Sequence, residues 1–281
     1  MAIKIYKPNR AARKNMSIVD RAGLHTGKPL KQLLIPATRT SGRGSEGKIT
    51  TRHRGGGVKR RLRLVDVGQT KMNVPAKVEQ VEYDPNRTAY LARIAYADGE
   101  RRYVLAWEGA KIGDVVITQE KAPETPGSRM QLKNITPGTF VFNVELLSGR
   151  GGKLFRSAGS YGILMDIKDD WAQVKMPSSE IRLILKDAYA TIGQVSNPDW
   201  RHQRIGSAGR KRRMGWRPSV TGKSMNPVDH PHGGGEGHQP IGLKYPKTPW
   251  GKHALGVKTR RASKYSDALI ISRRQKKLRK K

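Results

Sequence analysis

The chain has 281 residues with no cysteine, few aromatic residues and few acidic ones. Without a thiol it can form no disulfide framework, no thiolate metal site and no cysteine nucleophile. Hydrophobic residues make up 36% of the chain and aromatic residues 6%, enough for one or two small cores but not for one core spanning the chain. There is no apolar run of about eighteen residues, which argues against a transmembrane helix. The charged residues 1–15 contain no apolar stretch, which argues against secretion.

Positive charge is abundant and unevenly distributed. Lys and Arg number 56 against 22 Asp and Glu, a formal net charge of +34. Residues 1–60 hold 15 basic and 2 acidic residues, residues 61–200 hold 19 and 17, and residues 201–281 hold 22 and 3. Self-repulsion on this scale opposes compaction, so we expect a polyanionic partner. The candidates are nucleic acid and an anionic membrane surface.

The nearly neutral middle of the chain shows the alternating pattern of β-strands. Turn sequences separate the strands, notably DPN at 84–86 and DG at 98–99. A first set of strands is predicted at residues 62–67, 74–83, 88–97, 101–107 and 114–118. A second set follows a linker at 123–127 and is predicted at residues 139–147, 153–157, 162–167, 172–176, 181–186 and 191–195. Five strands within about sixty residues favour a small barrel, and the second set indicates another compact β unit.

This pattern divides the chain into four parts. They are a basic N-terminal extension at 1–60, β units at 61–122 and 123–200, and a basic extension rich in Gly, Arg and His at 201–281. Residues 201–262 show almost no apolar periodicity, so this segment is either disordered or folds against something else. The basic run at 273–281 fits a localisation signal, a solvated charge run or a specific contact. The expected fold class is mainly β with long irregular extensions.

Residues 42–48, with the sequence GRGSEGK, match two nucleotide-binding patterns. They fit the glycine spacing of a dinucleotide-binding loop and a phosphate-binding loop up to its lysine. Both loops require a preceding strand and a following helix, whose N-terminus receives the phosphate. The sequence after this segment is a poor helix, and Ile49 stands where a Mg²⁺-binding hydroxyl is needed. Nucleotide hydrolysis is therefore disfavoured.

Residues 52–61, with the sequence RHRGGGVKRR, favour contact with nucleic acid. Glycine lets a backbone approach a phosphate chain closely, and flanking Arg and Lys neutralise it. Arginine can also bind phosphate with two hydrogen bonds or stack on a base. The alternative is a flexible loop with solvated charge.

The segment HPHGGGEGH at 230–238 is the richest cluster for chemistry. Three imidazoles and a carboxylate could bind zinc, and His230 beside Asp229 could act as a general base in acyl transfer. No predicted helix holds these ligands at fixed spacing, and no nucleophile with a matched base is evident. We therefore favour an irregular loop whose imidazoles bind phosphates, sugars or bases. Three tryptophans lie in or beside this basic region and could stack on bases or pin the extension onto a β unit: Trp200, Trp216 and Trp250.

Five sequence blocks carry a family resemblance. They are GKITTRHRGGG at 47–57, EYDPNR at 82–87, LKNI at 132–135, RSAG at 156–159 and MNPVDHPHGGGEG at 225–237. In this order they closely resemble bacterial-type large-subunit ribosomal protein number two, the L2 family. The resemblance covers nearly the whole chain, and its last block is very specific.

The resemblance implies an OB-like RNA-binding barrel over 61–122 followed by an SH3-like barrel over 123–200. It implies a structural constituent of the large ribosomal subunit, a primary binder of ribosomal RNA that supports subunit association, tRNA binding and the peptidyl-transferase centre in translation. The histidine implicated in the family falls on His230. Because peptide-bond formation is attributed to RNA, the resemblance implies no enzyme, with His230 as a supporting candidate.

The resemblance also implies the partners. They are large-subunit ribosomal RNA, small-subunit ribosomal RNA at the subunit interface, other ribosomal proteins and, indirectly, tRNA. No membrane is expected, because no amphipathic helix with apolar anchors is visible. No cofactor and no metal site are expected, apart from Mg²⁺ or K⁺ associated with the RNA. The expected location is the cytoplasmic ribosome, and an organellar ribosome stays open.

The predicted RNA-binding residues are cationic, imidazole, indole, amide or glycine residues of the extensions and of turns in the β units. They are Arg43, Lys48, Arg52, His53, Arg54, Gly55, Gly56, Gly57, Lys59, Arg60, Arg61, Arg87, Arg156, Arg201, Arg204, Arg210, Lys211, Arg212, Arg213, Trp216, Arg217, Asn226, His230, His232, Gly233, Gly234, Gly235, Lys258, Arg260 and Arg261.

Overall fold

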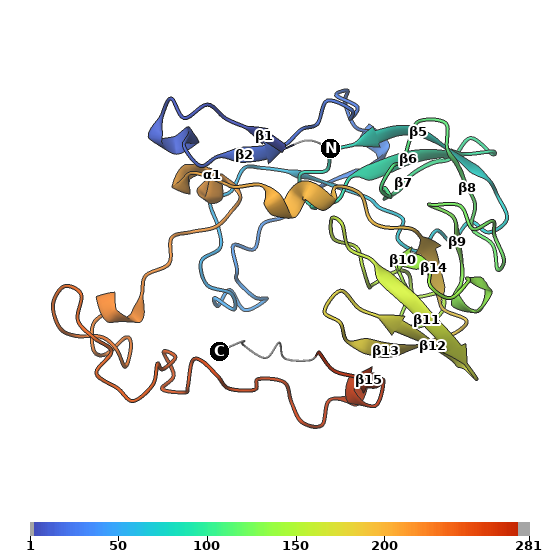
Figure 1. The fold of residues 1–281 in the computed structure, drawn as a ribbon. Helices are drawn as coiled ribbons and strands as arrows, with labels where there is room; N and C mark the ends of the chain where they lie inside the picture. The colour runs from blue at the N-terminus through green and yellow to red at the C-terminus, as the bar shows by residue number, and fades with distance from the viewer. Residues whose placement is uncertain (1–2, 275–281) are drawn as a thin grey trace. The chain divides into compact units, whose positions relative to one another are not determined.

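The computed structural model describes residues 3–274 (Figure 1). The contacts within the chain divide these residues into two units. Unit 1 comprises residues 3–38, 59–207 and 268–274, and unit 2 comprises residues 39–58 and 208–267. Of the basic run at 273–281, residues 275–281 lie outside the described part. Among the described residues, no helix is long and apolar enough to span a membrane.

The first β body of unit 1 is a four-stranded antiparallel sheet with the order β7-β6-β5-β8. Its strands are β5 (Ala76–Glu82), β6 (Leu91–Tyr96), β7 (Arg101–Leu105) and β8 (Val115–Val116). The alternation of β5 buries Ala76 and Val78, until a register shift between Val78 and Gln80 interrupts it. The turns at residues 84–87 and 97–100 connect β5 to β6 and β6 to β7.

The second β body is a seven-stranded antiparallel sheet with the order β15-β13-β12-β11-β10-β14-β9. Its strands are β9 (Arg129–Gln131), β10 (Phe140–Phe142), β11 (Gly162–Lys168), β12 (Trp171–Lys175), β13 (Ile181–Leu185), β14 (Tyr189–Ile192) and β15 (Ile270–Ser272). Consecutive hairpins join β11, β12 and β13, while β14 returns to pair with both β10 and β9. The C-terminal extension supplies β15, which pairs with β13.

The extensions contain only short regular elements. Two further antiparallel pairs are β1 with β2 and β3 with β4. The elements are β1 (Ile3–Ile5), β2 (Ser17–Val19), β3 (Leu34–Pro36), β4 (Arg61–Arg63), the helix α1 (Ala208–Arg213), and the 3-10 helices η1 (Ala11–Arg13), η2 (Lys31–Leu33), η3 (Leu132–Asn134), η4 (Pro198–His202), η5 (Gly222–Ser224) and η6 (Tyr265–Asp267). The η3 helix belongs to the second β body.

The mainly β fold class is confirmed, and every predicted strand except residues 153–157 overlaps an observed one. The strand at 153–157 is wrong. Leu154 forms only an isolated bridge with Val144, and Phe155 has a φ of +51°, which extended backbone does not allow. The sequence pattern does not indicate β9 or the three-residue strands β1, β2, β3 and β15, because such short strands carry almost no periodicity.

One continuous hydrophobic core joins the two β bodies. Trp107, just after β7, is buried, and its backbone forms an antiparallel bridge with Val195 of the second body. The Ser196 N–H donates to the carbonyl of Ala106 at 2.9 Å, and the Ser196 hydroxyl accepts the Tyr90 N–H at 3.0 Å. The two bodies therefore form one packed platform, although the sequence divides them at the 123–127 segment.

A buried ion pair lies inside the second β body. Arg129 is fully buried, and its Nη2 donates to Oε1 of Glu145 at 2.8 Å, while its Nη1 donates to the Asn143 carbonyl at 2.9 Å. The Glu145 carboxylate also accepts the backbone N–H groups of Gly149 and Gly151, at 2.9 and 3.1 Å. Burial lowers the pKa of Arg129, and the attraction of Glu145 opposes that shift. The pair thus fixes the 145–151 turn to β9.

We expect Glu145→Ala to lower the free energy of unfolding of the RNA-free protein by about 3–5 kcal/mol, because it leaves a buried guanidinium without its counter-charge. Urea unfolding followed by circular dichroism measures this change. Asp187→Ala, which removes an exposed pair with Lys133, is the control and should cost less than about 1 kcal/mol. Equal losses of unfolding free energy in the two variants would show that the buried Arg129–Glu145 pair contributes no more than an exposed pair.

Candidate nucleic-acid interface

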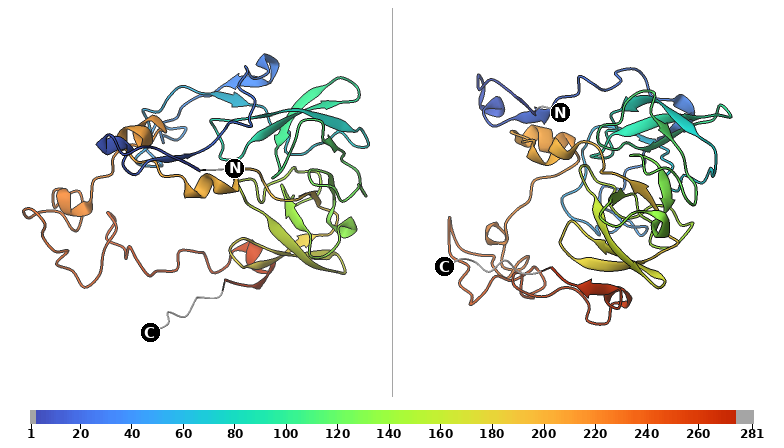
Figure 2. Two further views of the ribbon diagram at one scale, coloured as in Figure 1. Left: turned by 45° about the horizontal axis from the view of Figure 1, so that its top comes forward. Right: turned by 45° about the vertical axis from the view of Figure 1, so that its right-hand side comes forward.

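Unit 2 is strongly cationic and has no hydrophobic core. Residues 39–58 and 208–267 contain 18 Lys and Arg against 4 Asp and Glu. Among these residues, all of which the structure describes, only His230 and Ser266 are buried. From α1 onward the chain runs mostly as loops (Figure 2). Hydrophobic burial therefore contributes little to ordering unit 2, and polar contacts must hold it together.

The N-terminal and C-terminal extensions pair with each other in unit 2. The N–H of Gly55 donates to the carbonyl of Gly215 at 2.9 Å, and the N–H of Val58 donates to the carbonyl of Arg213 at 2.9 Å. In the opposite direction, the N–H of Arg217 donates to the carbonyl of His53 at 3.0 Å. Backbone groups of two segments far apart in the sequence thus satisfy one another. The sequence alone does not reveal this pairing.

The pairing requires a glycine at position 57. A Cβ on Gly57 would lie 2.9 Å from the Cα of Gly215, closer than real Cβ contacts. Two glycine-containing segments therefore cross with their backbones almost in contact. This close approach explains one glycine of the RHRGGGVKRR segment by packing inside the protein, independently of any phosphate.

A cationic cavity of about 460 Å³ lies where the two extensions meet. Seven of its lining residues were predicted from the sequence: Arg43, Arg52, His53, Arg54, Gly55, Gly56 and Arg217. The lining also includes Ser41, Thr51 and Pro218, which no sequence motif singles out. Guanidinium groups around a concave surface suit phosphate, which they can bind with paired hydrogen bonds. Lys48 is not part of this cavity, and its ammonium pairs with Glu46 at 3.2 Å on the surface.

Tryptophan rings adjoin the arginines of this region. The guanidinium carbon of Arg54 lies 3.6 Å from the ring centroid of Trp216, a stacked cation–π arrangement. The corresponding distance from Arg52 to Trp250 is 5.7 Å. Trp250 is 75% exposed at a turn closed by the hydrogen bond from the Thr248 N–H to the Lys252 carbonyl. This exposure favours base stacking over pinning for Trp250.

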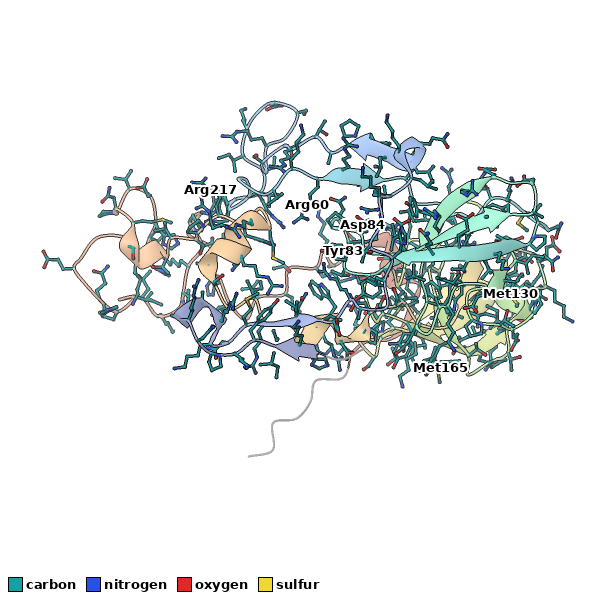
Figure 3. All side chains as sticks on the ribbon, turned by 90° about the horizontal axis from the view of Figure 1, so that it is seen from above. Arg60, Tyr83, Asp84, Met130, Met165 and Arg217 are labelled. Atoms are coloured by element: carbon teal, nitrogen blue, oxygen red, sulfur yellow. The ribbon has the colours of Figure 1, made fainter. Side chains whose placement is uncertain are left out.

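Several predicted residues belong to unit 1, where the EYDPNR block has a structural role (Figure 3). The carboxylate of Asp84 is fully buried and accepts Nε of Arg87 at 2.7 Å and Nη1 of Arg63 at 3.3 Å. Nη1 of Arg60 donates to the carbonyl of Pro85 at 2.6 Å, and the Asn86 amide donates to the carbonyl of Arg61 at 2.6 Å. The block therefore fastens the basic strand β4 to the β5–β6 turn.

The remaining predicted residues are spread over both units. Lys59, Arg156, Arg201 and Arg204 are exposed residues of unit 1, and the backbone N–H of Arg204 donates to the Ser17 hydroxyl at 2.9 Å. Four more form most of α1 in unit 2: Arg210, Lys211, Arg212 and Arg213. Lys258, Arg260 and Arg261 lie in an exposed loop, where Arg260 pairs with Asp267.

Residues 230–238, here called the histidine loop, are held in place by two of their own imidazoles. His230 is buried, and its Nδ1 accepts the N–H of His232 at 3.0 Å. The His230 ring fills the space beside Gly222, where a Cβ would come within 2.4 Å of the ring. Nε2 of His232 accepts the N–H of Lys247 at 2.9 Å. These two histidines therefore support the loop, whereas His238 is exposed.

Asn226 and the glycines 233–235, which are also predicted RNA-binding residues, contact one another and Met225 mainly through backbone atoms. Gly233 packs against the Asn226 carbonyl, and the Gly234 N–H donates to the carbonyl of Met225 at 3.1 Å. In the described part of the chain, no three His, Asp or Glu side chains are grouped so that they could hold a metal ion.

Two family models match this chain. Residues 30–118 match the model described as Ribosomal Proteins L2, RNA binding N-terminal domain, and residues 125–251 match Ribosomal Proteins L2, C-terminal domain. The first match contains the first β body and the RHRGGGVKRR segment. The second contains β9 to β14, α1 and the histidine loop.

Burial lowers the pKa of His232, and electrostatic interactions with His230, Lys247 and Lys223 lower it further. The unfolded loop therefore takes up the proton more readily than the folded one. The stabilisation of the loop by the hydrogen bond from the Lys247 N–H to His232 is complete above the ordinary histidine pKa of about 6.5. This stabilisation is lost as the pH falls toward the lower pKa of His232 in the folded protein. A protonated Nε2 can no longer accept the Lys247 N–H.

We therefore expect the hydrogen-exchange protection factor of the Lys247 amide, corrected for intrinsic exchange, to fall between pH 7 and pH 5. His232→Gln should remove this pH dependence, while His238→Gln in the same loop should retain it. A protection factor independent of pH in the unsubstituted protein would show that His232 does not hold Lys247.

Proposed function

Because this chain belongs to the ribosomal protein L2 family, we propose that its basic extensions anchor it in ribosomal RNA and support subunit association, tRNA binding and the peptidyl-transferase centre. In its coarser form the function follows from the family: the chain is an RNA-binding structural constituent of the large ribosomal subunit, and its location is the ribosome. The finer roles rest on the geometry of unit 2.

The cationic cavity between the extensions carries this proposal. Its arginines surround a concave surface in a unit without a hydrophobic core, so a polyanion would supply the counter-charge that unit 2 lacks. Phosphate contacts would fix position, and exposed rings such as Trp250 would stack on unpaired bases. Large-subunit ribosomal RNA is the proposed principal partner, with other ribosomal proteins beside it. Small-subunit RNA is proposed at the subunit interface, and tRNA indirectly.

We further propose that the histidine loop acts through its shape. The buried His230 ring and the bond from His232 to Lys247 hold the loop in one conformation, which can place RNA near a reaction without protein chemistry. The Nδ1 of His230 is occupied by a backbone N–H, so the arrangement does not favour a base oriented there by Asp229. Under this proposal the protein is not an enzyme and has no resident cofactor, and Mg²⁺ or K⁺ accompanies the RNA. The cytoplasmic ribosome is the proposed compartment.

Binding to large-subunit ribosomal RNA should weaken steeply with salt, with log K falling by about 0.9 or less per neutralised phosphate for each unit of log salt. Arg43→Gln should reduce this slope by about one. Trp250→Ala should lower affinity by about 1–3 kcal/mol and leave the slope unchanged. Filter binding across a salt series measures all three, with Lys133→Gln as the control. A flat salt response of the unsubstituted protein would overturn the proposal.

RNA-free protein should show no acyl-transfer turnover, with or without His230→Ala. In reconstituted large subunits, His230→Ala should reduce assembly or tRNA placement, because removing the ring leaves a void beside Gly222. His238→Ala, at an exposed position of the same loop, should behave like the unsubstituted protein. Turnover by RNA-free protein that His230→Ala abolishes would instead support an enzyme.

A further inference from the structure

A second cavity, in unit 1, differs in character from the cationic one. It has a volume of about 340 Å³ and opens between residues 21–27 of the N-terminal extension and the end of β5. This volume lies within the range of about 300–1,000 Å³ typical of small-ligand sites. The polar side chains that line it are Arg21, His25, Thr26, Arg63, Glu82 and Tyr83.

One wall of this cavity is flat. The guanidinium carbon of Arg21 lies 3.6 Å from the centroid of the Tyr83 ring, so the two planar groups stack. Tyr83 is 37% exposed, and Arg21 is exposed as well. Aromatic rings and guanidinium planes are the surfaces on which proteins stack unpaired bases. The wall therefore presents a stacking platform at the cavity mouth.

The acceptor of the cavity is a carboxylate held in a fixed orientation. Glu82 is 2% exposed, and the Tyr103 hydroxyl lies 3.1 Å from its Oε1 and 2.9 Å from its Oε2. Nη1 of Arg93 donates to Oε1 at 3.4 Å. Together with the guanidinium groups of Arg21 and Arg63, this carboxylate gives the cavity both hydrogen-bond donors and acceptors. The cavity therefore suits a ligand that carries donors as well as acceptors.

The donor of the cavity is an arginine with spare hydrogen-bonding capacity. The Arg63 side chain is only 10% exposed, and its Nη1 is used by Asp84. Its Nε is buried and has no hydrogen-bond partner among the described residues. A buried donor left without a partner costs free energy, and native structures rarely tolerate it. Because this nitrogen is shielded from solvent, a ligand in the cavity would reach Arg63 through its terminal guanidinium N–H groups instead.

We propose that this cavity receives one unstacked base of the ribosomal RNA. The base stacks against the Arg21–Tyr83 wall, a base acceptor takes a terminal guanidinium N–H of Arg63, and a base N–H donates to the Glu82 carboxylate. Nucleobases carry such donors and acceptors on their edges, whereas a phosphate carries acceptors only. The inference rests on the proposed RNA partner and adds a base-binding subsite remote in sequence from the histidine loop.

The test compares substitutions that remove stacking with substitutions that keep it. Tyr83→Leu removes the ring and Arg21→Lys removes the guanidinium plane, both without changing the net charge, and Tyr83→Phe keeps the ring. We expect the first two to weaken binding to large-subunit ribosomal RNA about tenfold, with an unchanged salt slope, and Tyr83→Phe to have little effect. Base-specific chemical probing should show one nucleotide protected by the unsubstituted protein and by Tyr83→Phe, and reactive with the other two variants.

The outcomes separate this inference from the broader proposal. If the unsubstituted protein does not bind the RNA, the proposed function fails. If it binds, and both Tyr83→Leu and Arg21→Lys retain its affinity and the protected nucleotide, only the base subsite is refuted. Thermal unfolding checks the fold of each variant, and Arg21→Lys, at an exposed position, decides the matter if Tyr83→Leu is unstable. Tight binding of free nucleoside monophosphates, with RNA affinity unaffected by either variant, would also refute an RNA-base subsite.

Discussion

Mutual repulsion among the lysines and arginines of unit 2 opposes any compact arrangement of residues 39–58 and 208–267. No core offsets this repulsion, so local order depends on backbone pairing, on the crossing of Gly57 and Gly215 and on the histidine loop. Unit 1 has the opposite balance, with a continuous core and acidic residues that pair with its arginines. The hydrophobic core therefore lies in unit 1, whereas unit 2 carries a large excess of positive charge without a core.

The sequence predicts the first β body well, because its strands alternate cleanly and its turns carry strong signals. The DPN turn before β6 is a case where sequence and structure agree, and the burial of Asp84 explains why an acid is needed there. The strand at 153–157 fails because Phe155 is buried with a positive φ, a backbone conformation that no alternation pattern reveals. β9 escapes notice because its three residues are almost entirely buried and show no alternation.

The candidate site is predictable in composition but not in arrangement. Runs of Arg and Gly indicate nucleic acid, but nothing in them indicates that residues 53–58 pair with residues 213–217. The histidine cluster is visible as a motif, yet nothing in the motif indicates that the His230 ring packs beside Gly222. Arg21 and Tyr83 escape sequence reasoning because they are distant in the chain and neither belongs to a basic run. Each omission concerns a contact between remote segments.

The pairing of β15 with β13 has a consequence for the polymer physics of the C-terminal extension. Residues 208–267 leave unit 1 after Ser207 and re-enter it at Ala268, so they form a closed loop rather than a free tail. Closing a chain at both ends removes conformational freedom before any ligand arrives, and the entropy of closure grows only slowly with loop length. A tethered loop also explores a smaller volume than a dangling tail of equal length. Folding of the β bodies therefore already restricts the conformations of residues 208–267. Less conformational entropy is then lost when this loop binds a large polyanion.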